Sequence, residues 1–428
     1  MSEHMPQSEN EVTHRLPTDW KGEAMQKRIS SRYASERRFK LIGLTAIVMS
    51  AGFLAFLLIS MLGNGLSGFM RTEIDVTFDF PKAPIMVDPA MLQGPNADRI
   101  LSNANLPTVT VQAARAALGN KGEDLLSPNA WVNVREAIKN DPSILQRVET
   151  LSLPAATKID MAAKGDAPAE AEAAYARLNE AGLASTHLNI DFLTSSDATD
   201  PSQVGIWGAL KGSLLTMAVT LLLSFPIGVL AALYLEEYAP QNRWTDMIEV
   251  SINNLAAVPS IIFGLLGLAI FLNVLHMPRS AALVGGLTLA LMTMPVIVIA
   301  GRNAIKAVPP SIRDAALGVG ASPVQVVFHH VLPLALPGIM TGTIIGMARA
   351  LGETAPLLMI GMRAFIASAP GGITDPATVL PVQIFLWSDE VSRGFVEKTS
   401  AAIIVLLAFL LSMNSIAIYL RNKFEKRW

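Results

Sequence analysis

The residues best placed to do chemistry are an arginine and a glutamate that interrupt an apolar segment. Arg349 and Glu353 are four positions apart, so on a helix both would lie on one stripe. Leaving either charge facing lipid would cost about 2.5–3.5 kcal/mol, so we expect both to face protein or water. The planar guanidinium of Arg349 could bind an oxyanion through parallel N–H donors. The competing interpretation is an ion pair that is only structural.

Glu353 has two roles open to it in such a site. It could hold Arg349 between binding events, or it could accept a hydrogen bond from a protonated oxygen of the anion. Sulfate carries no such proton near neutral pH, so a carboxylate there would disfavour it. We assign Arg349, Glu353 and Thr354 to a substrate pathway as a hypothesis.

Other kinds of site have little support in the sequence. The chain has no cysteine, which excludes disulfides and thiolate sites. His329 and His330 are adjacent, so on a helix they point about 100° apart and are poor co-ligands for a metal. The Walker A pattern does not occur. We therefore expect no catalytic residue, no metal and no cofactor bound by this chain.

A second group of residues, 309–333, has the pattern of two short helices joined by a tight turn. Pro310 suits a first helical turn, and Gly318 and Gly320 can adopt the left-handed backbone that ends a helix. A capping-box signature follows at 322–325. This punctuation, between two apolar runs of membrane length, predicts a segment with a role beyond connection.

The same segment resembles the EAA loop of ABC importer permeases, which docks a cytoplasmic ATPase. The matching residues, with Arg313 before them, are Asp314, Ala315, Ala316, Gly320, Leu332 and Pro333. Asp314 stands where Glu is usual, and His330 where Ile is common. The run 349–358 is similar to PstA-type permeases of phosphate importers. The resemblance covers roughly residues 205 to 428 and the first apolar run.

The resemblance implies an all-α polytopic membrane protein with six transmembrane helices. The residues of this chain add an inserted α+β extracytoplasmic domain, which short members of the family lack. It implies half of the translocation pathway for inorganic phosphate in a bacterial inner membrane. The expected partners are a homologous PstC-type permease, a PstB-type ATPase dimer that uses the ATP, and a periplasmic PstS-type binding protein. The ATPase would contact Arg313 and the motif residues, whose small side chains would fit a cleft.

Two alternatives remain open at this point. The cargo could be another oxyanion, such as sulfate or molybdate, with the architecture unchanged. A different class of protein is a membrane receptor whose extracytoplasmic domain senses a ligand. The net charge of −2 gives no reason to expect nucleic acid as a partner.

Composition and hydropathy supply the framework for these residues. The chain has 428 residues, of which 16% are charged, against about 25% in typical soluble domains. Runs of membrane-spanning length predict helices, because backbone groups cannot stay unpaired in lipid. They lie at 41–63, 210–235, 250–274, 281–301, 334–361 and 399–420. A basic cluster before the first run places the N-terminus in the cytoplasm. Six spans then return the C-terminus to the same side.

We divide the chain accordingly. Residues 1–40 form a cytoplasmic tail, 41–63 the first transmembrane helix, 64–205 a periplasmic insertion, and 206–428 the permease core with a coupling loop at 302–333. The insertion is acidic, with 11 Lys and Arg against 18 Asp and Glu between positions 71 and 200, a net charge of −7.

The insertion is predicted to fold as a small α+β domain. Apolar residues alternate over 73–80 and again over 188–192, which is typical of half-buried strands. Helical patterns occupy 110–119, 130–139, 143–151 and 168–183. We expect the first and last strands to pair and so bring the two ends of the domain together. The alternative is an unfolded acidic loop.

Small residues recur in the fifth apolar run. Gly338, Gly342 and Gly346 are spaced by four, so they share one helix face that allows close approach of another backbone. This face could pack inside the chain or form the seam with a second permease. The sequence favours neither.

Overall fold

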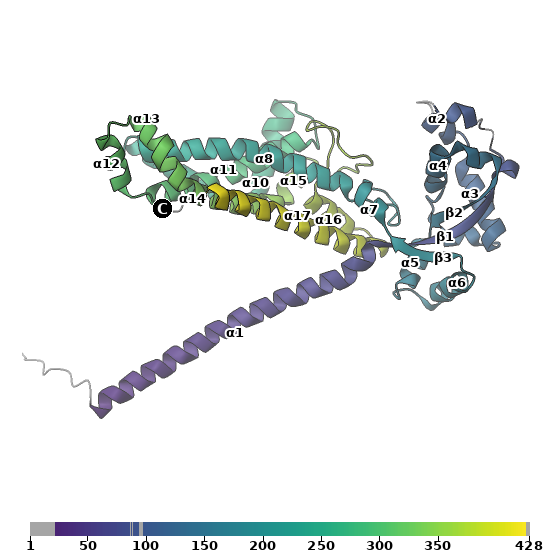
Figure 1. Cartoon of the computed structure of the whole chain (residues 1–428), viewed down its shortest axis with the longest axis horizontal. Helices are drawn as coiled ribbons and strands as arrows, with labels where there is room; N and C mark the ends of the chain where they lie inside the picture. Colours follow the sequence, from purple (N-terminus) through teal and green to yellow (C-terminus); the bar gives the residue numbers. More distant parts are fainter. Residues whose placement is uncertain (1–21, 86, 88, 94–96, 425–428) are drawn as a thin grey trace, which may run out of the picture. The chain divides into compact units, whose positions relative to one another are not determined.

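The computed structural model describes residues 22–424, except 86, 88 and 94–96, and Figure 1 shows its course. The chain divides into two units, Met1–Ser60 and Met61–Trp428. Helix α1 (Glu23–Gly68) occupies the first unit and continues into the second. It extends past both ends of the predicted span at 41–63. The extension before residue 41 forms because the polar residues there also favour helix. One stabilising contact in that part is the Lys40 Nζ–Glu36 Oε1 ion pair of 2.6 Å, at i, i+4.

The second unit contains a bundle of apolar helices. Helices α8, α11 and α14 pack against one another, and α17 lies along α14. Their shared apolar residues form two clusters, one at each end of the bundle. The elements are α8 (Trp207–Leu233), α9 (Arg243–Ala256), α10 (Ser260–Gly267), α11 (Ala282–Lys306), α12 (Pro310–Gly318), α14 (Leu332–Leu351), α15 (Ala355–Met359), α16 (Leu380–Ser388) and α17 (Gly394–Phe424).

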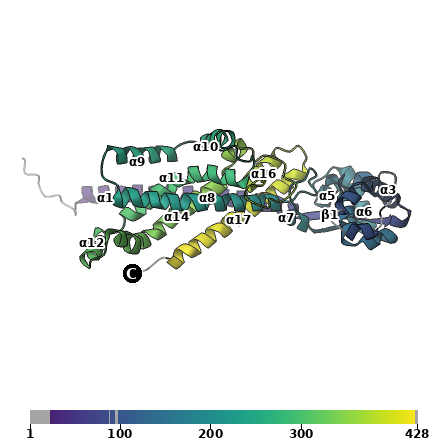
Figure 2. The same ribbon diagram turned by 90° about the horizontal axis from the view of Figure 1, so that it is seen from above.

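The predicted number of spans agrees with the structure in one way of counting. Among the described residues, five helices are long and apolar enough to cross a membrane, or six if the bent pair of α9 and α10 counts as one. Figure 2 shows α9 and α10 following one another on one side of α11. Within the predicted span at 250–274 the chain bends by 101° between these two helices. Pro259 lies at the bend and cannot continue a helix from the residue before it.

The fifth predicted span, 334–361, is also interrupted. Helix α14 ends at Leu351, and α15 begins only at Ala355. Gly352 follows the last residue of α14, and Pro356 lies in the first turn of α15, where a missing N–H leaves no helical hydrogen bond unmade. Glu353 and Thr354 therefore lie outside the helix, and their expected place on its stripe is wrong.

The insertion contains a three-stranded antiparallel sheet in the order β2-β1-β3. Strand β1 (Met70–Asp79) pairs with β2 (Val148–Pro154) on one side and β3 (Ala184–Leu188) on the other. The predicted alternation is confirmed, because Ile74, Val76 and Phe78 are at most 1% exposed in the core of the domain. The helices that accompany the sheet are α2 (Ala97–Ser102), α3 (Leu106–Leu118), α4 (Trp131–Asn140), α5 (Thr157–Ala163) and α6 (Ala169–Glu180).

Two local predictions for the insertion are wrong. The helix expected at 143–151 gives way to a 3-10 turn (Pro142–Gln146) and then β2, since pairing with β1 outweighs the local helical pattern. The last strand ends at Leu188, and Ile190–Thr194 forms α7. Asn189 causes this switch, because its side-chain oxygen accepts a 3.1 Å hydrogen bond from the Phe192 N–H and caps the new helix. The expected pairing of the first and last strands is confirmed.

Buried charges join the insertion to the membrane helices within the second unit. Lys164 Nζ lies 2.7 Å from Asp160 Oδ2 and 2.8 Å from Glu397 Oε2 on α17, and all three side chains are at most 15% exposed. On the next residue, Lys398 Nζ donates a 2.7 Å hydrogen bond to the Gly68 carbonyl at the end of α1. These bonds hold α5, α17 and the end of α1 together.

Replacing Lys164 with methionine should destabilise the protein. The change leaves two buried carboxylates without their shared cation, which costs about 3 kcal/mol for groups withdrawn from water. The measurement is the denaturant midpoint of the full chain in detergent. Lys82→Met is the matched control, because the Lys82 side chain is 85% exposed beside Asp79. Equal midpoints for the two variants would contradict the assigned role.

Candidate coupling surface and substrate pathway

The segment 309–333 folds as a helix, a tight turn and a capped second helix. Helix α12 ends at Gly318, and Gly320 has a φ of +90°, in the region that favours glycine. The predicted capping box is present: the Ser322 N–H donates to Gln325 Oε1 at 2.8 Å, and the Gln325 N–H donates to Ser322 Oγ at 3.4 Å. Gly318 remains helical, so Gly320 alone supplies the left-handed turn.

The second predicted short helix is the beginning of the fifth span. Helix α13 (Pro323–Gln325) passes through a π-helical turn (Val326–Val331) into α14. In Figure 1, α12 and α13 lie at one end of the bundle, next to each other. The rigid cap therefore connects the turn directly to a membrane helix.

The motif residues differ in what they contact. Ala316 is 5% exposed and packs with Val326 and Val327 inside the chain, so its small side chain has an internal reason. Asp314 and Ala315 are exposed. Leu332 and Pro333 are half-buried. The sequence therefore predicted the helix–turn–helix shape of the segment, but not that Ala316 lies inside the chain.

The surface of this segment is apolar at its tip. Leu317, Val319 and Val324 are 50%, 86% and 56% exposed, and they flank the Gly320 turn. We call these three residues the coupling tip. Sequence reasoning missed them, although apolar residues beside a polar turn and a cap were a visible signal. Exposed apolar groups of this kind mark interaction sites.

The predicted pair on α14 meets in the structure. Arg349 Nε lies 3.5 Å from Glu353 Oε1, even though Glu353 follows the end of the helix. The Arg349 side chain is 51% exposed and that of Glu353 is 19% exposed. Arg349 is thus held loosely at one nitrogen and presents the rest of its guanidinium outward.

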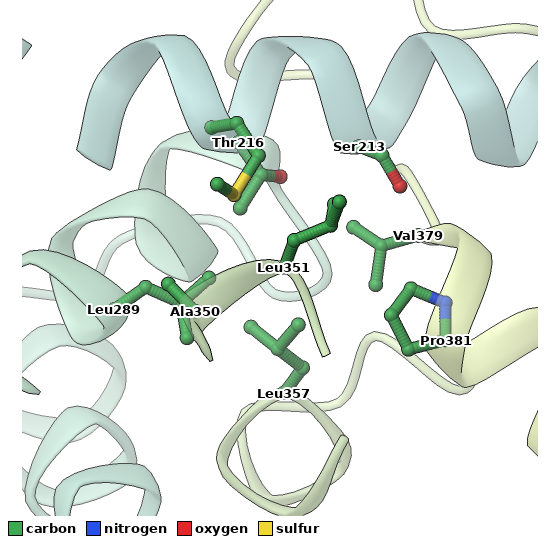
Figure 3. Close-up of a pocket in the computed structure, with 9 residues that line it drawn as sticks. Ser213, Thr216, Leu289, Ala350, Leu351, Leu357, Val379 and Pro381 are labelled. Atoms are coloured by element: carbon green, nitrogen blue, oxygen red, sulfur yellow. The ribbon is translucent and has the colours of Figure 1, made fainter. Parts of the chain in front are cut away.

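A cavity lies beside this pair but is not lined by it. It has a volume of only about 10 Å³ and lies between α8, α11, α14, α15 and the start of α16, and Figure 3 shows its lining. Ser213 Oγ accepts a 2.8 Å hydrogen bond from the Leu380 N–H, and the buried Thr216 hydroxyl has no partner among the described residues. The other lining residues are apolar, and ligand pockets are typically about 300–1,000 Å³. This cavity is therefore unsuited to a charged ligand.

Comparison with known proteins gives the family. A family model described as "Binding-protein-dependent transport system inner membrane component" matches residues 224–427. The probable ABC transporter permease protein YqgI of Bacillus subtilis is 32% identical over 212 residues, which cover 47% of this chain and 71% of the relative. The chain belongs to this family of ABC transporter permeases.

A second relative, a solved structure and a second family model are also similar to parts of the chain. The phosphate transport system permease protein PstA of Haemophilus influenzae is 30% identical over 227 residues, covering 53% of this permease and 79% of the relative. A chain of the MetNI methionine ABC transporter, solved in inward-facing conformations, aligns with 52% of the permease and 98% of its own length, at 18% identity and a TM-score of 0.42. A model described as a domain of unknown function matches residues 26–173.

Family membership fixes the general role. The chain is a permease subunit of an ABC importer and a multi-pass protein of the inner membrane, and it is not itself an enzyme. Its partner classes are an ATPase and a substrate-binding protein. The receptor alternative is thereby set aside.

The small-residue face of α14 is used inside the permease. A side chain at Gly338 would lie 2.7 Å from Ala304 Cβ, and one at Gly346 would lie 2.9 Å from Thr293 Cγ2, both on α11. Gly342 meets Ala300 of the same helix. Of the two sequence interpretations, internal packing describes this face.

An open hollow of about 460 Å³ lies where the chain enters α8 and leaves α16. Its lining includes Asp197, Arg363, Phe365, Trp387 and Glu390. The Trp387 Nε1–H donates a 3.0 Å hydrogen bond to Asp197 Oδ1. Burial raises the pKa of the Asp197 carboxyl above its ordinary value, despite this bond.

The raised pKa gives a signed prediction for Asp197→Asn. Because the pKa of Asp197 is higher in the folded protein than in the unfolded chain, the carboxyl contributes fully to folding stability below the unfolded pKa of about 3.9. This contribution to stability is lost as the pH rises through the pKa of the folded protein. The amide cannot ionise and still accepts from Trp387. We expect the variant to unfold at higher denaturant than wild type at neutral pH, with the difference closing near pH 4. Asp389→Asn, an exposed change in the same hollow, is the control, and a less stable variant at neutral pH would refute the prediction.

Proposed function

We propose that this permease forms half of the translocation pathway of an ATP-driven importer of inorganic phosphate. Relatives named as phosphate permeases support the cargo, including PstA 1 of Mycobacterium tuberculosis at 35% identity over 156 residues. The observation that carries the coupling half of the proposal is the coupling tip. The observation that carries the cargo half is Arg349, which is charged, half exposed and placed at the end of an apolar helix.

The geometry of α12 and its turn supports coupling to an ATPase. Three large apolar side chains at the coupling tip lie open to water, which is unfavourable unless another protein covers them. Asp314 and Ala315 are exposed on the same segment, and the Gly320 turn keeps it narrow. A partner with an apolar cleft, such as a PstB-type ATPase dimer, fits this surface. The ATP would be hydrolysed entirely in that partner.

The exposure of Arg349 supports a pathway beside this residue. A guanidinium facing lipid is costly, so its open side must meet water or a second subunit. A homologous PstC-type permease placed there would close a pathway between the two chains. Arg349 would bind the phosphate oxygens through its fork of donors, and Glu353 would accept from a protonated oxygen. Thr354, next to the pair, would line the same route.

The transport cycle would be alternating access. A periplasmic PstS-type binding protein would deliver phosphate to one mouth of the pathway, and closure of the ATPase would displace α12 and reorient the helices. The orientation that this requires has both termini and the 302–333 loop in the cytoplasm and the 64–205 insertion in the periplasm. The basic residues before the first span support it.

Replacing Val319 with aspartate should uncouple the permease from its ATPase. The side chain is 86% exposed, so the fold should be unaffected, but a charge would enter the apolar contact. We expect co-purification of the ATPase to fall by roughly tenfold or more, as for a central interface residue. Val391→Asp is the matched control, because Val391 is 98% exposed outside this segment. Equal co-purification of the two variants would exclude the docking role.

Replacing Arg349 with alanine should abolish most phosphate uptake while the complex still assembles. Loss of charged hydrogen bonds to the anion is worth roughly 10–100-fold, and Arg349→Lys should lie between alanine and wild type because it keeps the charge but not the fork. The measurement is labelled-phosphate uptake in a strain deleted for this chain. Arg363→Ala, which removes an exposed arginine from the Asp197 hollow, controls for charge. Unlabelled sulfate that competes as well as phosphate would favour the other oxyanion cargo.

A further inference from the structure

Two adjacent glutamates at the end of α8 contact different helices. Glu236 and Glu237 lie in the π-helical turn Tyr234–Tyr238 that ends this span, and their side chains are only 15% and 11% exposed. Carboxylates this far withdrawn from water require charged partners. Because consecutive residues on a helix point in different directions, the two find their partners on separate elements.

Glu237 is paired with the coupling helix. Arg313 Nη2 on α12 lies 2.6 Å from Glu237 Oε1, and Nε of the same guanidinium lies 3.2 Å from that oxygen. The remaining donors of Arg313 reach the Val308 carbonyl at 2.8 Å and the Ile305 carbonyl at 3.1 Å, at the end of α11. Arg313, expected from the sequence to meet the ATPase, is instead committed to α8 and α11 of its own chain.

Glu236 is paired with α11 and, through it, with α9. Arg302 Nε lies 3.2 Å from Glu236 Oε2, while Arg302 Nη2 lies 2.9 Å from Glu249 Oε2 on α9. Arg302 is 14% exposed, so it is more than the solvated anchoring charge that its sequence position favours. Lys306 contributes a longer contact of 3.7 Å to Glu236 and is 55% exposed.

The pairs differ from the apolar contacts around them in what they resist. Helix α9 has no buried residue, so little apolar packing fixes its position along α11. An apolar contact can slide at small cost, whereas the Arg313–Glu237 pair, with two guanidinium nitrogens on one carboxylate, fixes both distance and angle. A displacement of α12 would therefore pull on the end of α8 through Glu237. It would reach α11 and α9 through the neighbouring Glu236.

We propose that the Arg313–Glu237 pair, continued by Glu236, Arg302 and Glu249, is the connection that transmits movement of the coupling helix to α8, α11 and α9. This rests on the proposed coupling of α12 to an ATPase. The five residues are positioning residues, since they touch neither substrate nor nucleotide. Through this pair, a movement of α12 would also move the end of α8.

The test is Glu237→Gln in the complete transporter reconstituted in vesicles. Glutamine keeps the shape and removes the charge that holds Arg313. We expect the ATPase to co-purify in the normal amount and ATP hydrolysis to continue, while phosphate moved per ATP hydrolysed falls about tenfold, the size expected when a coupling contact is lost. Lys306→Gln is the control, because it also replaces a charged side chain of the cluster with glutamine, but at an exposed position. It should leave the ratio unchanged.

A double variant, Glu237→Gln with Arg313→Gln, separates a shared function from two independent ones. If the residues act as a pair, the double variant should lose no more than either single variant. If Glu237→Gln is not produced, Glu237→Asp shortens the reach by one methylene while keeping the charge, and it is judged by the same ratio.

Three outcomes discriminate between the hypotheses. An unchanged ratio of phosphate to ATP in the Glu237 variant overturns the transmission proposal. Loss of ATPase co-purification in that variant overturns it as well, because the pair would then serve docking. If wild-type permease itself binds no ATPase, the proposed function fails, and that result is distinct from either of the others.

Discussion

This permease depends on one constraint: a charge removed from water needs a partner, and here the partner belongs to another element. Lys164 in the insertion meets Glu397 on α17, and Arg313 on α12 meets Glu237 at the end of α8. Apolar packing among α8, α11 and α14 supplies cohesion. The charged pairs add fixed points to it, because each joins two elements at a single place.

The parts of the fold that the sequence predicted well are those whose signals are local. The alternation over 73–80 predicted β1, since burial of one sheet face requires a period of two. Gly320 and the 322–325 capping box predicted the turn, because a positive φ and a capping hydrogen bond each depend on one or two neighbouring residues. Hydropathy predicted the spans for the same reason.

The parts that it did not predict depend on distant partners. Strand β2 forms because Leu153 and its neighbours pair with β1, some 80 positions earlier in the chain. The residues 143–151 carry a helical pattern that this pairing overrides. Arg313 precedes a docking motif, yet it forms an ion pair with Glu237, which is distant in the sequence. The sequence placed the charge of Arg349 beside Glu353, but it could not show that half of the arginine side chain stays exposed.

The beginning of α17 limits how the chain can vary in length. Glu397 and Lys398 are consecutive and reach two different neighbours, Lys164 and the Gly68 carbonyl. A single-residue insertion or deletion just before them would rotate both side chains by about 100° and break both bonds together. Gly394 depends on the same rotation of α17 about its axis, because its missing side chain leaves room for Thr157 and Pro201. A change of length at the start of α17 is therefore more disruptive than one in an exposed loop.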